Sequence, residues 1–544
     1  MAPEPDSNPI KEDEDDDNVA PSHHPSAPSD ELFSISTTVD PSYIISLIRK
    51  LLPRDVKNDH DSDGVDACNA SNQGLKTNHM KESVVSPCED EMLNSSHDKI
   101  ETMDTLDGFD ELARQEKTGE VSCSRFEDSS ISVREKAWEE YGCILWDLAA
   151  SRIHAEFMVQ NLMLEVLLAS LIVSQSTRVT EISLGILGNL VCHEIPMKQI
   201  ASTDKLIEIV VDQLFLDDTP CLCEACRLLT LGLQGSECVI WAKALQSEHN
   251  LCRVIWVAEN TLNPQLLEKS IGLLLAILES QQEVVSILLP TLMNLGLSSL
   301  LINLLTFEMS KLASERIPER YSILDLILRT IEALSVLDDY SQDICSNKEV
   351  FRLVSDLVRL PDKVEVANSC ITAAVLIANI LIDAADLASE ISQDLPFLEG
   401  LLDIFPFASD DPEARSALWS IMARLLVQVQ ESEISSSSLQ QYVSVLVSKS
   451  DLIEDDLLDH QLDDSNENNV SSITSAAKQN ARTTALRGIF NILNQWTTSK
   501  DCDMKNNLMG ADHDNGENVE RLLNCCRKYT EISSGLGLCL PKSA

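Results

Sequence analysis

The stretch Ser183-Leu184-Gly185-Ile186-Leu187-Gly188-Asn189-Leu190 (SLGILGNL) carries the pattern that decides the fold. It places an aliphatic residue four positions after a small one, asparagine after six, and a second aliphatic residue after seven. The same pattern returns at residues 373–380 (AAVLIANI) and 485–492 (ALRGIFNI). Weaker copies near Ala225 (ACRLLTLG) and Ser270 (SIGLLLAI) reduce the interval to about 42 to 46 residues.

Repeats of about 40–47 residues are typical of armadillo and HEAT units, which contain two or three helices each. We therefore predict an all-α, armadillo/HEAT-like helical-repeat solenoid of about seven or eight repeats. Only 4% of the residues are aromatic and the chain has just 17 glycines, which favours stacked helices over a β-rich fold. The rhythm falters twice: at residues 307–320, where a polar stretch predicts a lid or a long loop, and again before Ala485.

The formal charge of −47 is spread unevenly. Residues 1–130 hold 30 acidic and 11 basic side chains, and the remaining 414 residues hold 58 and 30. Both parts are acidic, which argues against binding to nucleic acid or to anionic membranes, because phosphate contacts need clusters of Lys and Arg. Basic protein partners are favoured electrostatically, although acidic runs such as residues 12–17 commonly serve only to keep a tail in solution.

Residues 1–131 are predicted to be a disordered acidic tail, since they are rich in Asp, Ser, Asn and Pro and have no sustained helical periodicity. Within this tail, residues 40–52 (DPSYIISLIRKLL) predict a short amphipathic helix that Asp40 caps and Pro53 ends. This helix either docks on the first repeat or is presented to another protein. Ser86 precedes a proline and an acidic run, which makes it a candidate phosphorylation site.

The solenoid is expected over residues 132–500, with a disordered acidic loop at 451–475 inside the last repeat. Residues 501–544 are expected to be a C-terminal tail with a short helix at 519–529. The sequences DTP at 218–220 and DDP at 410–412 predict helix starts, because an acidic cap stands just before proline.

The amino terminus, the apolar stretches and the cysteines bear on where the protein resides. The acidic amino terminus lacks the basic start and apolar core of a signal peptide. No stretch reaches about 18 uninterrupted apolar residues, and residues 371–381, the longest candidate, are interpreted as a buried helix. The 16 cysteines are scattered over apolar helix positions, so free thiols in a reducing compartment are expected. We therefore expect a nuclear or cytoplasmic protein that is not secreted, and the monomer is favoured.

No catalytic constellation is present in the sequence. It has no glycine-rich phosphate loop, no His-Glu-x-x-His motif and no nucleophile elbow. Cys223 and Cys226 have the spacing of a zinc half-site, and Cys192 and His193 lie one repeat earlier, but a structural zinc needs four ligands. These cysteines alternate with leucines as small core residues do, so we favour packing and predict no metal, cofactor or enzymatic activity.

Asparagine at the sixth position of the motif suggests a comparison with armadillo proteins of the importin-α type. In that group, an Asn works with a Trp four residues earlier to bind basic peptides. Here the residues four positions before Asn189, Asn379 and Asn491 are Gly185, Val375 and Arg487. The Trp is absent, so we favour a structural role in which Asn hydrogen-bonds the backbone between repeats, with partner-peptide contact as the alternative.

Residues 178–192 (RVTEISLGILGNLVC) resemble the signature of the serum amyloid A-like 1 proteins, which belong to the armadillo superfamily. Two further stretches agree: LWDL at 145–148 with Phe157 at the matching spacing, and DTP at 218–220 leading to EACRLL at 224–229. The resemblance is specific over residues 138–233. It implies an intracellular, largely nuclear, non-enzymatic protein linked to the promotion of cell proliferation.

The pattern and the resemblance together predict a non-enzymatic scaffold or adaptor whose repeats form a long groove for a segment of another protein. The alternatives are a transport receptor or chaperone for basic cargo, and a regulatory subunit of a kinase, phosphatase or ligase. The candidate partner-binding residues are Arg178, Glu181, Asn189, Arg227, Asn379, Arg424 and Asn491.

Overall fold

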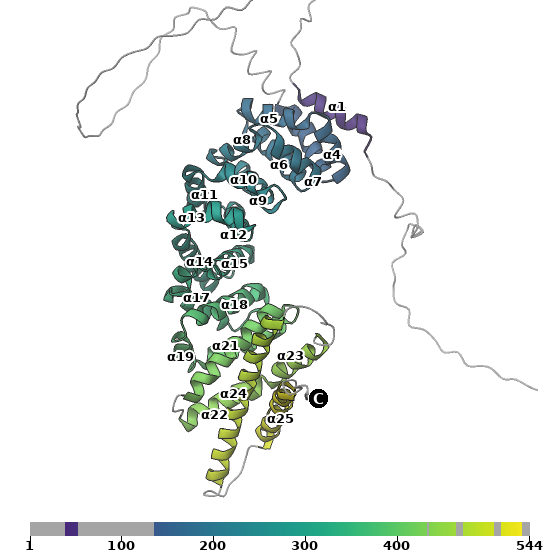
Figure 1. Ribbon diagram of the computed structural model, residues 1–544. Coiled ribbons are helices and arrows are strands. Elements are labelled where there is room, and N and C mark those ends of the chain that lie inside the picture. Colours follow the sequence, from purple (N-terminus) through teal and green to yellow (C-terminus); the bar gives the residue numbers. More distant parts are fainter. Residues whose placement is uncertain (1–38, 53–134, 432–434, 464–471, 505–512, 536–544) are drawn as a thin grey trace, which may run out of the picture. The chain divides into compact units, whose positions relative to one another are not determined.

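The computed structural model describes residues 39–52, 135–431, 435–463, 472–504 and 513–535 (Figure 1). The described residues form helices and no strands. Eight of these helices form a continuous layer, which we call the ladder, because each contacts the next one. The ladder helices are α3 (Cys143–Ala149), α6 (Thr177–Val191), α9 (Thr219–Gln234), α12 (Pro264–Leu278), α15 (Tyr321–Ser335), α18 (Ala367–Asp383), α21 (Pro412–Glu431) and α24 (Ser472–Met504).

The remaining helices pack against the ladder and against one another. They are α1 (Pro41–Leu51), α4 (Arg152–Gln160), α5 (Met163–Val173), α7 (Glu194–Ser202), α8 (Leu206–Asp212), α10 (Cys238–Leu245), α11 (Glu248–Asn260), α13 (Gln282–Asn294), α14 (Leu297–Ser314), α16 (Ser341–Cys345), α17 (Lys348–Val358), α19 (Leu387–Ile391), α20 (Leu395–Leu402), α22 (Ser436–Ser448), α23 (Ser450–Asp463) and α25 (His513–Gly535). Short turns of π- or 3₁₀-helix are η1 (Trp138–Gly142), η2 (Gln213–Phe215), η3 (Pro318–Arg320), η4 (Val364–Val366) and η5 (Phe405–Ala408). The armadillo-type solenoid predicted from the sequence is confirmed.

The repeated motif lies on the ladder helices and forms their buried face. The small residues Ser183, Ala373 and Ala485 are fully buried, and so are the aliphatic residues four and seven positions later. A small residue at this place lets neighbouring ladder helices approach closely, and the aliphatic residues fill the space between them. The motif therefore specifies the contact between repeats.

Polar caps begin several ladder helices. The carboxylate of Asp218 accepts a hydrogen bond from the backbone N–H of Cys221 at 3.0 Å, at the start of α9. The Asn263 side chain caps α12 in the same way, and Asp411 accepts bonds from two N–H groups at the start of α21. Proline occupies the first turn after each of these caps, where its missing N–H costs nothing.

Helix α1 docks on the first repeat, where it contacts η1, α3, α4 and α5. Asp40 caps it as expected, and its apolar residues Ile44, Leu47, Ile48 and Leu51 are almost completely buried. The Lys50 ammonium lies 4.1 Å from the centre of the Tyr141 ring. Of the two alternatives for this helix, docking within the chain is therefore the one observed. The rest of the predicted tail, Ser86 included, lies outside the described residues.

Two predictions of loops were wrong. The stretch 307–320 is not a lid, because residues 307–314 are the last two turns of α14 and only a short link precedes α15. The acidic stretch 451–475 is not one loop either, because α23 spans Ser450–Asp463 and α24 starts at Ser472. Ile453 and Leu457 are buried, so α23 has an apolar face despite its charge. The helix expected at 519–529 is longer, runs as α25 and packs on α22, α23 and α24.

Among the described residues, one helix, Val364–Asp383, is long and apolar enough to cross a membrane, and up to three candidates result if two bent helix pairs are counted as well. This criterion considers length and composition only. The apolar stretch is longer than residues 371–381, which the sequence reading had singled out. Its central part, α18, packs between α15, α17 and α21, and its side chains Leu376, Ile377 and Leu381 are fully buried by protein. Position in the ladder therefore accounts for the apolar character of this helix.

Candidate functional site: the ladder face

The two glycines of the motif in α6 make room for side chains from the neighbouring ladder helices. A methyl group at Gly185 would overlap the indole ring of Trp146, which comes from α3. A methyl group at Gly188 would overlap the guanidinium group of Arg227, which comes from α9. The glycines thus allow a Trp from one side and an Arg from the other to lie across α6.

Asn189 connects these two side chains. Its Nδ2 donates to the backbone carbonyl of Trp146 at 2.9 Å, and its Oδ1 accepts a bond from Arg227 Nη1 at 3.3 Å. Arg227 Nη2 also donates to the carbonyl of Gly185 at 3.1 Å, and its Nε donates to Glu224 at 2.7 Å. Three successive ladder helices are therefore joined by one polar network at the ladder surface, where Arg227 remains about a quarter exposed.

The other two asparagines also bridge repeats. Asn379 Nδ2 donates to Ser335 Oγ at 3.0 Å, and Asn491 Nδ2 lies 3.4 Å from Gln430 Oε1. The predicted hydrogen bond from Asn to the backbone of a neighbouring repeat is observed for Asn189, whereas Asn379 and Asn491 contact side chains instead. The motif in α6 has no Trp of its own. An indole nevertheless lies against α6 at Gly185, because Trp146 of the neighbouring ladder helix α3 packs there.

All seven candidate partner-binding residues lie on ladder helices, but they do not form one cluster. Arg178 and Glu181 form an ion pair at 2.6 Å that raises the pKa of the arginine. Arg424 donates to the carbonyl of Leu381 at 2.7 Å, so it links α21 to α18. The structure brings Arg178 and Glu181 together, and it brings Asn189 and Arg227 together. The other three residues lie on α18, α21 and α24, and their partner-binding role stays a prediction.

The middle of the ladder carries polar residues that the sequence reading missed. Arg329 on α15 pairs with Glu279 on α12 at 2.8 Å. One helical turn away, the pKa of Glu332 is raised by burial and by the carboxylates of Glu413, Glu279 and Asp411, against which Arg329 acts in the opposite direction. Burial likewise raises the pKa of Asp325. This section of the ladder is therefore rich in negative charge. Its signal in the sequence is the presence of charged residues inside otherwise apolar helices.

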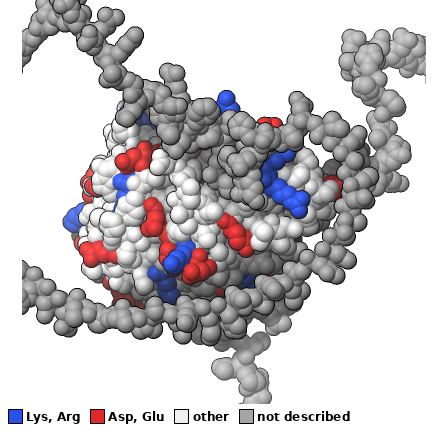
Figure 2. Space-filling view, turned by 90° about the horizontal axis from the view of Figure 1, so that it is seen from above, with Lys and Arg blue, Asp and Glu red and all other residues white. Residues whose placement is uncertain are grey.

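One face of the described part mixes charges. On the face seen in Figure 2, acidic and basic side chains are interspersed, with more acidic ones among the residues coloured. No group of three or more possible metal ligands occurs in the described residues. The described part therefore offers ion pairs and carboxylates for binding, spread over the helices.

The cysteines that had zinc spacing lie in the core. Cys221, Cys223 and Cys226 are buried, and the Cys221 thiol donates to the carbonyl of Thr177 at 3.0 Å. Burial raises the pKa of Cys223 to about 11 and that of Cys226 to about 12. These thiols are protonated at neutral pH, and they occupy the places of small apolar side chains, as the helical spacing predicted.

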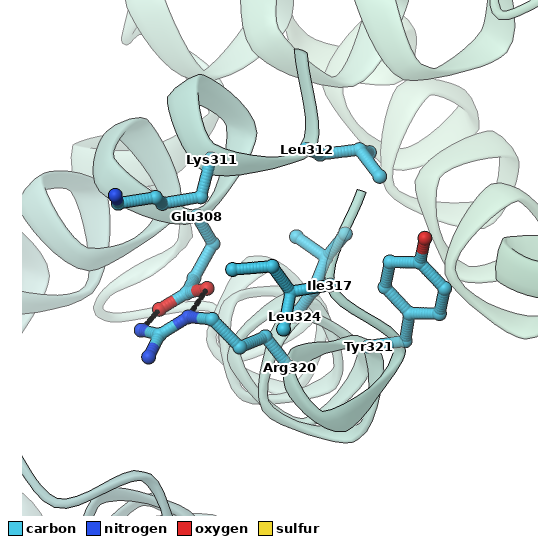
Figure 3. Close-up of a pocket in the computed structure, with 7 residues that line it drawn as sticks. All are labelled: Glu308, Lys311, Leu312, Ile317, Arg320, Tyr321 and Leu324. Carbon is cyan, nitrogen blue, oxygen red and sulfur yellow. Dashed lines mark hydrogen bonds and ion pairs between the residues drawn. The ribbon is translucent and has the colours of Figure 1, made fainter. Parts of the chain in front are cut away.

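A small recess lies between α14 and α15 (Figure 3). It encloses about 220 Å³, part of which is open solvent. Glu308, which is only 2% exposed, points toward Arg320 and forms a two-pronged ion pair with it. The ion pair between Glu308 and Arg320 joins the end of α14 to the turn before α15. Because the Glu308 carboxylate is already paired and the recess is small, we do not assign the recess as a substrate site.

The fold and the polar ladder surface define a helical-repeat protein of the armadillo type. Its sequence is similar to serum amyloid A-like 1 proteins, which confirms the resemblance seen in the motif. Protein saal1 of Danio rerio is 28% identical over 158 residues, which are 29% of this chain and 34% of the relative. Protein SAAL1 of Homo sapiens is 25% identical over 166 residues, covering 30% and 34%. The match thus spans about a third of the length of these curated relatives.

No family model matches the chain. Among solved structures, an engineered protein aligns with 74% of this chain and 90% of its own length at a TM-score of 0.44 and 15% identity. A designed armadillo repeat protein in complex with the peptide (KR)4 aligns with 45% of this chain and 94% of its own length, at a TM-score of 0.36 and 12% identity.

Proposed function

We propose that this protein is a non-enzymatic scaffold that holds a segment of another protein along its ladder face. The observation that supports this most strongly is the ladder itself. Its helices follow one another in contact, and each presents partly exposed polar side chains next to those of its neighbour. Stacked repeats of this kind provide an extended binding surface, because a bound segment touches several units at once.

The polar network of α3, α6 and α9 keeps this surface rigid. Asn189 and Arg227 form most of their hydrogen bonds with neighbouring repeats, so they position the ladder helices. The more exposed ladder residues, such as Arg178 and Arg329, are free to exchange their carboxylate partners for those of a bound protein. A rigid surface of this kind lowers the entropy that binding must overcome.

The test is a pull-down with the tagged full-length chain from its own cells, comparing two charge reversals. Arg178→Glu combined with Arg329→Glu alters two ladder arginines that are 45% and 44% exposed. Arg352→Glu on the outer helix α17 is the matched control, because that arginine is 54% exposed and also pairs with carboxylates. Exposed pairs contribute at most about 1 kcal/mol to stability, so both variants should fold.

We expect a discrete partner to be recovered by the wild type and by Arg352→Glu, and to be lost with the ladder variant. Recovery of the same partner with all three proteins would contradict binding at the ladder face. Binding of this partner should persist at high salt, because contacts along a groove are only partly screened.

A second candidate, a carrier of basic cargo, is favoured by one observation. Glu332, Glu279, Glu413 and Asp411 lie close enough to raise the pKa of Glu332 together with burial, and a cationic segment would relieve this repulsion. If this function is correct, many basic proteins should be recovered at low salt and lost at high salt, since exposed charges are screened over about 10 Å at 0.1 M.

We also propose that the protein works in the nucleus or cytoplasm, in connection with cell proliferation. The support is the resemblance together with free cysteines in the described residues, which suit a reducing compartment. Fluorescence microscopy of the tagged chain tests the location, and a signal confined to the secretory pathway would contradict it.

A further inference from the structure

Large apolar residues recur in the turns that lead into the ladder helices. Five of them stand two to five positions before the ladder helix begins, and we call them the turn row. They are Val173 before α6, Phe215 before α9, Leu262 before α12, Val364 before α18 and Phe407 before α21. Leu262 is 96% exposed and Val364 is 71% exposed, and even the two phenylalanines are 37% exposed. Before α15 the equivalent Ile317 is partly exposed.

Single exposed apolar residues are common on proteins and need no explanation. The turn row differs because its members recur within two to five residues of the start of a ladder helix; Val173 is the last residue of α5, and Phe215, Val364 and Phe407 lie in short 3₁₀ turns. Random surface residues would not follow the repeat. Within the row, Phe215 stacks on His249 with ring centroids 4.4 Å apart, so one face of its ring is already covered. The recurrence therefore indicates a shared contact.

Contacts between repeats place successive turns side by side. The Cys221 thiol bonds the carbonyl of Thr177, which joins the starts of α9 and α6. Arg253 on α11 donates to the carbonyls of Leu214 and Leu216, on either side of Phe215. Arg316 pairs with Asp362 at 3.1 Å, which joins the turns before α15 and α18. Because packed helices lie about 8–10 Å apart, the row presents an apolar side chain roughly every 10 Å.

The charges beside the turn row are mostly negative. The Asp217 side chain is 93% exposed next to Phe215, and Glu365 follows Val364 directly. Asp410 and Glu413 are exposed near Phe407. Arg253 pairs with Asp217 and Arg316 with Asp362, and Lys363 is almost fully buried, so Glu365, Asp410 and Glu413 carry the negative charge beside the row. An apolar row flanked by carboxylates complements a polypeptide that carries both apolar and basic side chains.

The spacing indicates the conformation of this partner. An extended chain rises about 3.3 Å per residue, so every third side chain matches a step of roughly 10 Å. A helix would need about seven residues for the same step, since it rises 1.5 Å per residue. It would then offer one apolar residue in two turns, which is too few for a stable amphipathic helix.

We propose that the turn row is a second docking surface, separate from the ladder face, which binds an extended basic segment of another protein with an apolar side chain at every third position. The segment would run across the turns, with its apolar side chains against Phe215, Leu262 and Val364 and its Lys or Arg side chains against the flanking carboxylates. This goes beyond the scaffold function, because it adds a surface at the edge of the repeats and specifies the chemistry of its occupant.

The test measures binding of a fluorescent peptide with the repeating pattern Leu-Lys-Ser, about 15 residues long to span five turns, by fluorescence anisotropy with the full-length chain. Leu262→Asp combined with Val364→Asp should weaken its binding about tenfold, because two apolar contacts are lost and two negative charges cannot replace them. The matched control is Ile153→Asp on α4, which is 64% exposed but outside the row and should leave the affinity unchanged.

A second peptide, with Ser in place of every Leu, separates the turn row from general attraction to the acidic chain. It keeps the positive charge and should bind about tenfold more weakly than the first. The proposal is overturned if the Leu-Lys-Ser peptide does not bind, if the double variant binds it as well as wild type, or if the two peptides bind equally. Arg178→Glu with Arg329→Glu should retain the peptide, so failure of the ladder-face function is distinguishable from failure of this proposal.

Discussion

The contacts that join α6 to its neighbours differ in kind from those that hold α23 against α21. Around α6, two glycines and one asparagine let side chains of adjacent repeats cross the helix, and the network stays partly exposed. Around α23, the carboxylate of Asp456 accepts bonds from Arg415 Nε and Trp419 Nε1, both at 2.8 Å, in the interior. The side chains of Arg415 and Asp456 are only 3% and 4% exposed.

The two regions depend on different physics. The contacts of α6 rest on shape and on partly exposed hydrogen bonds, including those of the Arg227–Glu224 ion pair, so each residue should contribute a moderate amount. The pair beneath α23 is charged and dry, and it is stable only while both partners are present. The comparison predicts that single substitutions will be most damaging at α23, although the sequence motif lies at α6.

The largest effect is expected for Asp456→Ala. It removes the Asp456 carboxylate from the buried ion pair and leaves the indole N–H of Trp419 without its acceptor, which should cost about 3–5 kcal/mol. Urea unfolding and hydrogen exchange in α23 measure this. The neighbouring Asp455 is exposed, so Asp455→Ala is the control and should stay within about 0.5 kcal/mol.

Replacing both partners at once provides a second check. Arg415→Met with Asp456→Leu should recover part of the loss, because the ion pair is removed as a whole, whereas the indole N–H of Trp419 still lacks the Asp456 acceptor. Equal stability of Asp456→Ala and Asp455→Ala would show that α23 does not depend on the buried pair.

Glycine substitutions in two ladder helices should have opposite signs. Gly185→Ala forces a methyl group into the ring of Trp146 and should destabilise by about 1–3 kcal/mol. Gly272→Ala in α12 meets nothing within 4 Å, and it should stabilise by about 0.5–1 kcal/mol because alanine favours helix. The urea midpoints of the two variants decide this, and a stabilised Gly185→Ala would contradict the proposed packing of Trp146.

The asparagines offer a finer comparison within the motif. Asn189→Ala removes a bond to the Trp146 carbonyl and one from Arg227, so we expect a loss of about 1 kcal/mol. Asn491 is exposed and its contact with Gln430 is long at 3.4 Å, so Asn491→Ala should cost only a few tenths of a kcal/mol. Thermal unfolding of both variants tests the difference, and equal losses would mean that the network around Asn189 adds nothing.

The same contrast explains what the sequence could predict. The fold class followed from a repeated local pattern, because every copy of the motif has the same task between ladder helices. Helix α23 was mistaken for a loop because its charged sequence gives no sign of the buried pair between Asp456 and Arg415, which lie 41 positions apart. No local pattern reports such a pair. The partial site at Asn189 was predictable for the same reason as the fold, whereas Glu332 on α15 carries no repeated signature.

The smallest effect concerns the middle of the ladder and depends on pH. Burial, and then Glu413, Glu279 and Asp411, raise the pKa of Glu332 above its ordinary value of 4.5, so the folded chain binds a proton there more readily than the unfolded chain. Stability therefore falls as pH rises from 4.5 through the raised pKa, and the full penalty is present at neutral pH. Glu332→Gln removes the charge and keeps the shape.

We expect Glu332→Gln to be more stable than wild type at neutral pH, with a difference that shrinks as pH falls through the raised pKa toward the ordinary value of 4.5. Urea midpoints of both proteins at several pH values measure this, with the exposed Glu413→Gln as a control that should show a smaller gain. A variant that is less stable than wild type at neutral pH would mean that Glu332 is held by a favourable partner. The middle of the ladder would then resemble the buried Arg415–Asp456 pair more than the partly exposed network around α6.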